Sequence, residues 1–159
     1  ACIPNSGKYW AYKDDFSNVP TYGYLYNYEA AKDLCPSGWH LPTSVDWEEL
    51  KNFLGGSKEV GPKMKSSSGW KEGGEGTNES GFNGMPGGWL TAYGLPMNAL
   101  QSARWWTSSP SPFLPNDQNI VRQLSDHSVS GGGSSGGMIG RDNYWHHYGF
   151  SVRCLKDPE

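Results

Sequence analysis

The spacing of apolar residues predicts a short helix that begins at Tyr28. Tyr28, Ala31 and Cys35 follow one another at intervals of three and four residues, which places them on one face of a helix. Pro36 and Gly38 come directly afterwards, and both residue types favour the end of a helix. We therefore expect a first short helix over residues 28–35 with one buried stripe.

A second helix is predicted a few residues downstream by its N-terminal signal. Thr43 is followed three residues later by Asp46, and this pair can form a capping box that satisfies two backbone N–H groups. The apolar residues at helical spacing are Trp47, Leu50 and Leu54. Gly55 supplies the left-handed conformation that commonly ends a helix. The apolar segment between the two helices, residues 38–42, is expected to be a strand.

Four further segments have the aromatic and β-branched composition of strands. They are residues 22–28 (YGYLYNY), 104–109 (RWWTSS), 119–124 (NIVRQL) and 149–157 (GFSVRCLKD). Residues 57–88 and 128–140 are instead rich in Gly and Ser, which predicts long loops. We expect Trp70 and Phe82 to anchor the first of these loops on the core. The predicted core consists of Leu34, Trp39, Leu41, Trp47, Leu50, Trp105, Phe150 and Val152.

Composition places the chain among loop-rich globular proteins. It has 159 residues with eight tryptophans and 35% apolar residues, enough to bury a core, and we expect a single domain over residues 1–159. There are 22 glycines and 11 prolines, whereas charged residues make up only 18%, below the roughly 25% of typical domains. Residues 1–27 are expected to be an irregular N-terminal segment with a strand, and residues 57–147 a region that displays ligand contacts.

Charge and hydropathy exclude two classes of partner. The net charge is −3 and the sequence pI is about 5.8, so the chain has no basic stripe that could neutralise nucleic-acid phosphates. No segment approaches the ~20 apolar residues of a transmembrane helix. The chain begins with Ala and carries no signal peptide, from which we expect a secreted domain whose targeting segment has been removed.

The three cysteines predict one disulfide and one remaining thiol. Cys35 and Cys154 lie on the two strongest structural elements, and we predict that they pair. Such a bond would close a loop of ~120 residues, for which chain entropy gives about 5 kcal/mol of stabilisation. Cys2 could be a lipid-modified cysteine, a free thiol or an intermolecular bridge.

Histidines and acidic residues are the candidates for chemistry. His146 and His147 follow Asp142 and could serve as bases or metal ligands, but neighbouring residues of a strand point to opposite faces and cannot grip one ion. We therefore expect them to contribute to a binding surface and His40 to be hydrogen-bonded in the core. We expect no cofactor; the alternative is a structural calcium ion. Its candidate ligands are Glu72, Glu75, Asn78 and Glu79.

Five motifs in matching order cover most of the chain: CPSGWHLPTSVDWEEL (35–50), KMKSSSGW (63–70), GTNESGFNGMPGGW (76–89), WWTSS (105–109) and YGFSVRCLKD (148–157). In these motifs the chain resembles the Fibrobacter succinogenes major paralogous domain. The resemblance implies an α+β, C-type lectin-like fold with two short helices, antiparallel sheets and long irregular loops. It also implies an extracellular or cell-surface bacterial protein, often a lipoprotein or adhesin, without established catalytic chemistry.

The later part of the chain departs from this family in residues 109–117 and 126–137, where lectin-fold proteins vary their ligand surface. In the related variable proteins of diversity-generating retroelements, mutagenesis rewrites such loops into residue types that this chain carries here. We therefore predict a ligand surface built from residues 110–118, 126–131 and 141–147. Its predicted contact residues are Phe113, Asn116, Asp117, Asp126, Ser128, Ser130, Asp142, Asn143, Tyr144, Trp145, His146 and His147.

Three functions follow as hypotheses. The first is a non-enzymatic surface domain that recognises a protein or a carbohydrate through loops on a rigid scaffold. The second is an enzyme similar to formylglycine-generating enzymes, which share the broader fold and use a cysteine pair; free and reactive Cys35 and Cys154 would favour it. The third is a purely structural module of a larger surface protein. The sequence contains no Gly-x-Ser-x-Gly motif and no Walker loop.

Overall fold

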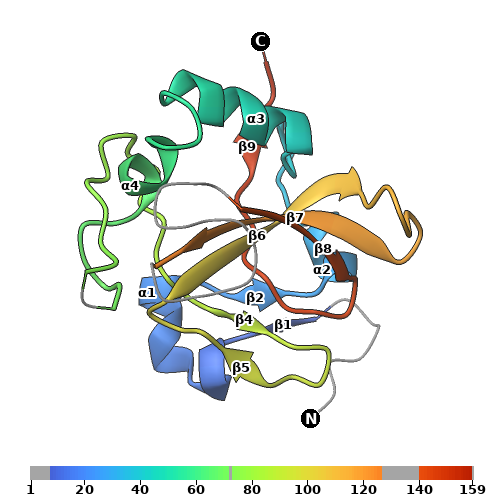
Figure 1. Ribbon diagram of the computed structural model, residues 1–159. Coiled ribbons are helices and arrows are strands. Elements are labelled where there is room, and N and C mark those ends of the chain that lie inside the picture. Colours follow the sequence, from blue (N-terminus) through green and yellow to red (C-terminus); the bar gives the residue numbers. More distant parts are fainter. Residues whose placement is uncertain (1–7, 72, 127–139, 159) are drawn as a thin grey trace.

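The computed structural model describes residues 8–71, 73–126 and 140–158 (Figure 1). Its helices are η1 (Tyr12–Asp14), η2 (Phe16–Asn18), α1 (Val19–Tyr22), α2 (Tyr28–Ala31), α3 (Ser44–Phe53) and α4 (Val60–Met64). Its strands are β1 (Tyr9–Trp10), β2 (Leu25–Tyr26), β3 (Trp39–His40), β4 (Trp89–Leu90), β5 (Pro96–Met97), β6 (Ser102–Pro110), β7 (Gln118–Ser125), β8 (Gly140–Trp145) and β9 (Leu155–Lys156). The chain is therefore of the α+β class, with short helices and small antiparallel sheets.

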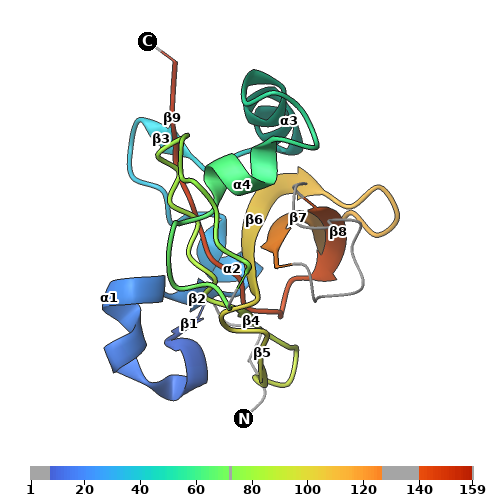
Figure 2. The ribbon, with the colours of Figure 1, turned by 60° about the vertical axis from the view of Figure 1, so that its left-hand side comes forward.

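The largest sheet consists of β6, β7 and β8, all antiparallel to their neighbours. Three two-stranded sheets pair β1 with β2, β3 with β9, and β4 with β5. In both Figure 1 and Figure 2, α3 and α4 lie on one side of the large sheet, while α1 and the strands β1, β2, β4 and β5 lie on the other. The large sheet is thus an inner layer, which explains why residues 119–125 of β7 are all buried.

Consecutive tryptophans on β6 point into two different cores, as the alternation of a strand requires. Trp105 belongs to the core on the side of α3 and α4, together with Trp47, Val60, Met64, Trp70, Ala103 and Leu124. Trp106 belongs to the core on the opposite side, together with Ala31, Leu41, Val121 and Phe150. The predicted strands over residues 104–109 and 119–124 are confirmed, and both are longer than the sequence pattern indicated.

Helix α3 begins with the predicted capping box. The Thr43 side chain accepts a hydrogen bond from the Asp46 N–H (3.2 Å), and the Asp46 carboxylate accepts one from the Thr43 N–H (2.7 Å). Trp47 is 3% exposed, with Leu50 and Leu54 packed against the same core. Gly55, just after the helix, has a φ of +104°, the left-handed conformation expected of it.

A buried cation that the sequence did not point to fastens α3 to the large sheet. Arg122 on β7 is 2% exposed, and its Nη1 donates to Glu48 Oε1 at 2.7 Å. Its Nη2 donates to the carbonyl and the hydroxyl of Ser44 at 2.9 and 2.6 Å. Hydrogen bonds to the charged guanidinium offset the cost of burying it.

The first helix is shorter than predicted, and two predicted core residues are not in the core. Asn27 caps α2 by accepting the Ala30 N–H at 3.1 Å, but the helix ends at Ala31, four residues before Cys35. Leu34 is therefore in a turn and 41% exposed. Trp39 is 45% exposed, because β3 pairs only with β9 at the periphery and directs this residue outward.

The Gly-rich loop over residues 57–88 contains a short helix that the sequence pattern missed, α4. Its Pro62 lies in the first turn, where a missing N–H costs no helical hydrogen bond. The predicted anchors are confirmed: Trp70 is 5% exposed and its Nε1 donates to Ser66 Oγ and to the Gly84 carbonyl, both at 3.1 Å. Phe82 packs against the core of α3.

The C-terminal segment returns through the molecule and is held at several points. Phe150 exchanges two backbone hydrogen bonds with Tyr26, at 2.8 and 3.0 Å. The predicted disulfide between Cys35 and Cys154 is present, with a Cα–Cα distance of 5.7 Å. The predicted strand over residues 149–157 is correspondingly replaced by isolated bridges and by the short strand β9.

His40 joins the C-terminal segment to the start of α3. Its Nδ1 lies 2.6 Å from Asp157 Oδ1, and its Nε2 lies 3.5 Å from Asp46 Oδ2. The ring is hydrogen-bonded as predicted but partly exposed, rather than in the core. The hydrogen bond to Asp157 raises the pKa of His40 above its usual value of 6.5.

Reduction of the disulfide should destabilise the protein. Loss of a native disulfide costs about 2–5 kcal/mol, which corresponds to a fall in Tm of roughly 5–20 °C for a chain of this size. Thermal melts followed by circular dichroism with and without reductant measure this. A Cys35→Ala, Cys154→Ala double variant should melt at the reduced temperature under both conditions; equal Tm values for oxidised and reduced wild type would contradict the prediction.

The two tryptophans flanking the start of α3 should differ in their contribution to stability. Trp47→Ala removes a buried ring between Trp105 and Phe82, whose centroids lie 5.8 and 5.7 Å away, and should cost on the order of 3–5 kcal/mol. Trp39→Ala is the matched control, since its ring is largely exposed, and should cost well under half as much. Urea unfolding gives both changes in unfolding free energy. Equal losses would show that Trp47 is not more deeply buried than Trp39.

The His40–Asp157 pair should make stability depend on pH. Because the pKa of His40 is higher in the folded chain than its unfolded value of about 6.5, the stabilisation is complete below that value and is lost as pH rises through the folded pKa. The difference in unfolding free energy between wild type and Asp157→Asn should therefore be larger at about pH 5.5 than at about pH 8.5. A difference that does not change with pH would exclude this pair as the cause.

Candidate functional site

Among the described residues, the predicted ligand contacts form one group at each end of the large sheet, with Asp142, Asn143 and Tyr144 on β8 between them. One end is where β7 begins and β8 ends, since Gln118 pairs with Trp145. The other end is where Gln123 pairs with Gly140, and Asp126 follows β7 there. Eight residues of β7 span about 26 Å, so the two groups cannot contact one small ligand together.

The first group surrounds a pocket of about 370 Å³, which we call the Trp145 pocket. Its lining residues are Asn27, Glu29, Asp117, Trp145, His146 and His147. The last four were predicted from the sequence and are brought together by the structure. Asn27 and Glu29 were not predicted, because they lie at the start of α2, far away along the chain, and contact this region only in the folded protein.

The loop between β6 and β7 is held by short-range hydrogen bonds. Ser111 is 1% exposed, and its hydroxyl accepts the N–H groups of Phe113 and Leu114 at 3.2 and 3.4 Å. The Gln118 N–H donates to the Leu114 carbonyl at 2.9 Å. This backbone leaves Phe113 78% exposed, and Asn116 and the pocket residue Asp117 are exposed as well.

His146 has a structural task within the pocket. Its ring stacks on Tyr28 with a centroid distance of 4.5 Å, and its Nε2 lies 2.9 Å from Asn119 Oδ1. The Asn119 Nδ2 donates to the Thr107 carbonyl at 3.0 Å, so its Oδ1 is the acceptor and His146 Nε2 carries the proton. Burial lowers the pKa of His146, which favours the neutral ring.

Trp145 and His147 supply the accessible part of the pocket. Trp145 is 41% exposed, and its ring lies nearly parallel to that of His147, with centroids 6.2 Å apart. The carboxylates of Glu29 and Asp117 line the same space. The pocket therefore combines exposed aromatic faces with hydrogen-bond acceptors, an arrangement that suits a ligand with a flat or ring-shaped face and donor groups.

The remaining predicted residues of β8 are placed differently. Tyr144 turns inward: its ring lies 4.9 Å from that of Phe150, and its hydroxyl accepts a hydrogen bond from Arg104 Nη1. Burial raises the pKa of Tyr144. Asp142 and Asn143 are half-buried on β8, and Asn143 Oδ1 is buried without a hydrogen-bond partner among the described residues.

The second predicted group is represented by one described residue. Asp126 is 4% exposed, and the loop at Gly74 lies so close that a Cβ atom on Gly74 would come within 2.8 Å of Asp126 Cβ. Ser128 and Ser130 lie outside the described residues, as does Cys2. A ligand surface that includes Ser128 and Ser130 therefore stays a prediction.

The described residues also bear on metal binding. Of the candidate calcium ligands, Glu72 lies outside them, and the Asn78 side chain accepts the Asn83 N–H at 2.7 Å. Across the ranges 8–71, 73–126 and 140–158, no group of three or more His, Cys, Asp or Glu side chains is arranged to hold a metal ion. Within the same ranges no helix has the length and apolar character of a membrane span.

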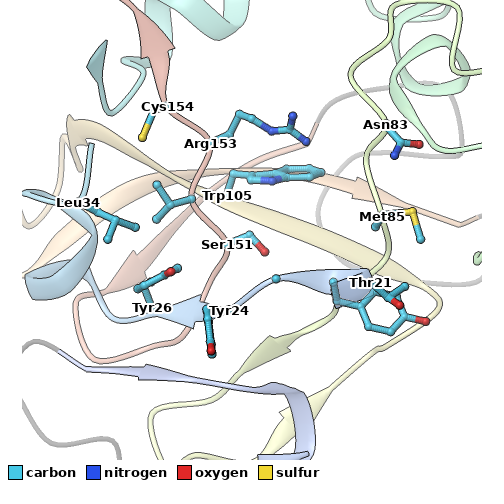
Figure 3. Close-up of a pocket in the computed structure, with 13 residues that line it drawn as sticks. Thr21, Tyr24, Tyr26, Leu34, Asn83, Met85, Trp105, Ser151, Arg153 and Cys154 are labelled. Atoms are coloured by element: carbon cyan, nitrogen blue, oxygen red, sulfur yellow. The ribbon is translucent and has the colours of Figure 1, made fainter. Parts of the chain in front are cut away.

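Sequence reasoning missed a second and larger pocket of about 450 Å³, which we call the Arg153 pocket. Figure 3 shows residues from three separate parts of the chain around it: 21–34, 83–85 and 151–154, with Trp105 of β6. In the sequence, the tyrosines of residues 22–28 indicate only a strand. Since no single segment contains the pocket, no local pattern could have indicated it.

The comparison with family models adds to this description. The α+β architecture and the disulfide define a small disulfide-linked domain, and residues 3–156 match the model of the Fibrobacter succinogenes major domain. The chain belongs to this family. No curated protein and no solved structure matches the chain significantly.

Proposed function

We propose that this protein is a non-enzymatic recognition domain that binds a protein or a carbohydrate through the Trp145 pocket and the neighbouring loop over residues 110–118. The observation that carries the proposal is the convergence of Asp117, Trp145 and His147 around one open pocket. Exposed aromatic side chains beside polar groups are enriched among the residues that dominate binding energies.

The scaffold under the pocket favours recognition over flexible catalysis. The His146 ring is held by Tyr28 and Asn119, and the backbone N–H of His146 donates to the Asp117 carbonyl at 3.0 Å. A binding surface that is ordered before the ligand arrives loses less entropy on association. Among the described residues that line the pocket, no Ser, Cys, Thr or Lys nucleophile stands beside a base.

We further propose a C-type lectin-like arrangement and a location on the bacterial surface. Two features support the arrangement: the C-terminal segment is joined by the disulfide to the segment that follows α2, and long irregular segments separate the short helices and strands of the described chain. The disulfide supports an oxidising compartment. Anchoring through Cys2 is part of the same proposal, and mass spectrometry of the native protein tests it. Diversification of the loops by a retroelement is also part of it, and sequencing of the gene in related isolates tests this.

The function is tested by finding a ligand and then removing the pocket. A glycan array and a pull-down from the surface fraction of neighbouring bacteria separate a carbohydrate from a protein ligand. A Trp145→Ala, His147→Ala variant should lose affinity for that ligand by a few kcal/mol, a factor of about 30 or more, with Tm nearly unchanged. Calorimetry gives the affinity.

A matched control uses an exposed aromatic on another face. Phe53→Ala removes a side chain that is 87% exposed at the end of α3 and should leave binding intact. Full binding by the Trp145→Ala, His147→Ala variant would reject the Trp145 pocket as the site. A Tyr144→Ala variant is unsuitable for this purpose, because its ring belongs to the core.

A further inference from the structure

The Arg153 pocket is built on backbone that is fixed on both sides. Ser151 donates its N–H to the Arg104 carbonyl at 2.9 Å and accepts the Trp106 N–H at 3.1 Å, so this residue is tied to β6. The preceding residue pairs with Tyr26, and Cys154 is bonded to Cys35. A ligand that contacts residues 151–154 would therefore meet a preorganised wall.

One charged side chain lines this pocket among its described residues, Arg153. Its guanidinium lies 4.4 Å above the Phe82 ring, and its Nη2 donates to the Phe82 carbonyl at 3.0 Å. No carboxylate lies within ion-pair distance of Arg153 in the described part of the chain, although the protein as a whole is acidic. The guanidinium is thus oriented by Phe82 and keeps N–H donors for an anion.

The rest of the lining combines aromatic and uncharged polar groups with the aliphatic side chains of Leu34, Met85 and Val152. Figure 3 shows Ser151 between Trp105 and the two rings of Tyr24 and Tyr26, with Asn83 across the pocket. The centroids of Tyr24 and Tyr26 are 6.3 Å apart and their planes are inclined by 69°. Aromatic faces beside hydroxyl and amide groups suit a hydroxylated ring, whose C–H face packs on a ring while its hydroxyls form hydrogen bonds.

We infer that the Arg153 pocket binds a sugar that carries a carboxylate, such as a hexuronate residue, with the carboxylate on Arg153 and the ring against Tyr24 and Tyr26. A free amino acid fits less well, because its ammonium group would face no carboxylate in the lining. A phosphate ester would bring about two charges to a single cation. A fatty acid would require a continuous apolar wall, which Ser151 and Asn83 interrupt. The inference concerns a different pocket from the proposed function and does not depend on it.

Titration of the ¹⁵N-labelled protein with D-galacturonate, followed by NMR, tests the inference. We expect saturable shifts at Ser151, Arg153 and Tyr24, with a Kd on the order of 1 mM for one sugar residue. Arg153→Gln should weaken binding by about tenfold or more, the factor that corresponds to a lost hydrogen bond to a charged group. Arg141→Gln, which removes an exposed arginine on β8, is the matched control and should leave the Kd unchanged.

Further ligands and variants decide between the chemical classes. Neutral D-galactose should bind at least about tenfold more weakly than galacturonate, and benzoate should not bind more tightly. Equal affinity for galactose, tighter binding of benzoate, or an unchanged Kd in Arg153→Gln would each overturn the inference. If polygalacturonate displaces D-galacturonate from the protein, a polymer is identified as the source of the ligand. If polygalacturonate does not displace it, the free monosaccharide is identified as the ligand.

A second variant distinguishes a lost ligand contact from misfolding of the protein. Tyr24→Leu keeps an apolar side chain but removes the aromatic face, and it should weaken galacturonate binding with the amide spectrum otherwise retained. The Trp145→Ala, His147→Ala variant should bind galacturonate like wild type. Loss of galacturonate binding in that variant would place the sugar at the Trp145 pocket and reject the Arg153 pocket.

Discussion

The burial of β6 on both faces is the constraint on which the rest of the structure depends. Trp105 and Trp106 are adjacent in the chain, and the strand directs them into different cores. Each ring then needs its own cover: α3 and α4 supply it on one side, and Phe150 of the C-terminal segment supplies it on the other, 4.8 Å from Trp106. Without the returning C-terminal segment, the second core would be open to water.

A sheet buried on both faces must also accommodate its polar residues, and the two buried arginines do so differently. Arg122 is paired with Glu48 and Ser44, as a buried charge requires. Arg104 is 3% exposed and lies 4.4 Å from the Trp89 ring and 4.8 Å from that of Tyr144. Because Tyr144 turns inward to contact Arg104, the alternation of β8 turns Trp145 outward. The inward position of Tyr144, which contacts Arg104 and Phe150, thus goes together with the exposure of Trp145 at the surface.

The parts of the structure that could be predicted are those whose signals are local. The start and end of α3 lie within residues 43–55, so the capping box and the terminal glycine can be recognised without knowledge of the fold. Leu34 lies outside the core because α2 ends at Ala31, and Trp39 lies outside it because β3 pairs with the distant C-terminal strand β9. The sequence can single out residues 145–147 because they are aromatic and polar outside any core pattern, and the structure places all three around one pocket. The Arg153 pocket could not be recognised, since its groups come from separate segments whose approach is set by tertiary contacts.

The two pockets share one support but are lined by different side chains. Residues 24–29 run beside residues 145–154: Tyr26 pairs with Phe150, and the Tyr28 N–H donates to the His146 carbonyl at 2.9 Å. Along this pair of segments, Tyr24 and Tyr26 line the Arg153 pocket, whereas Asn27 and Glu29 line the Trp145 pocket. A change in the backbone of either segment would therefore disturb both pockets. A change confined to an exposed side chain, such as that of Arg153 or Trp145, alters one pocket and leaves the common support in place. The two proposed binding sites can therefore be tested separately by mutation, even though they share a scaffold.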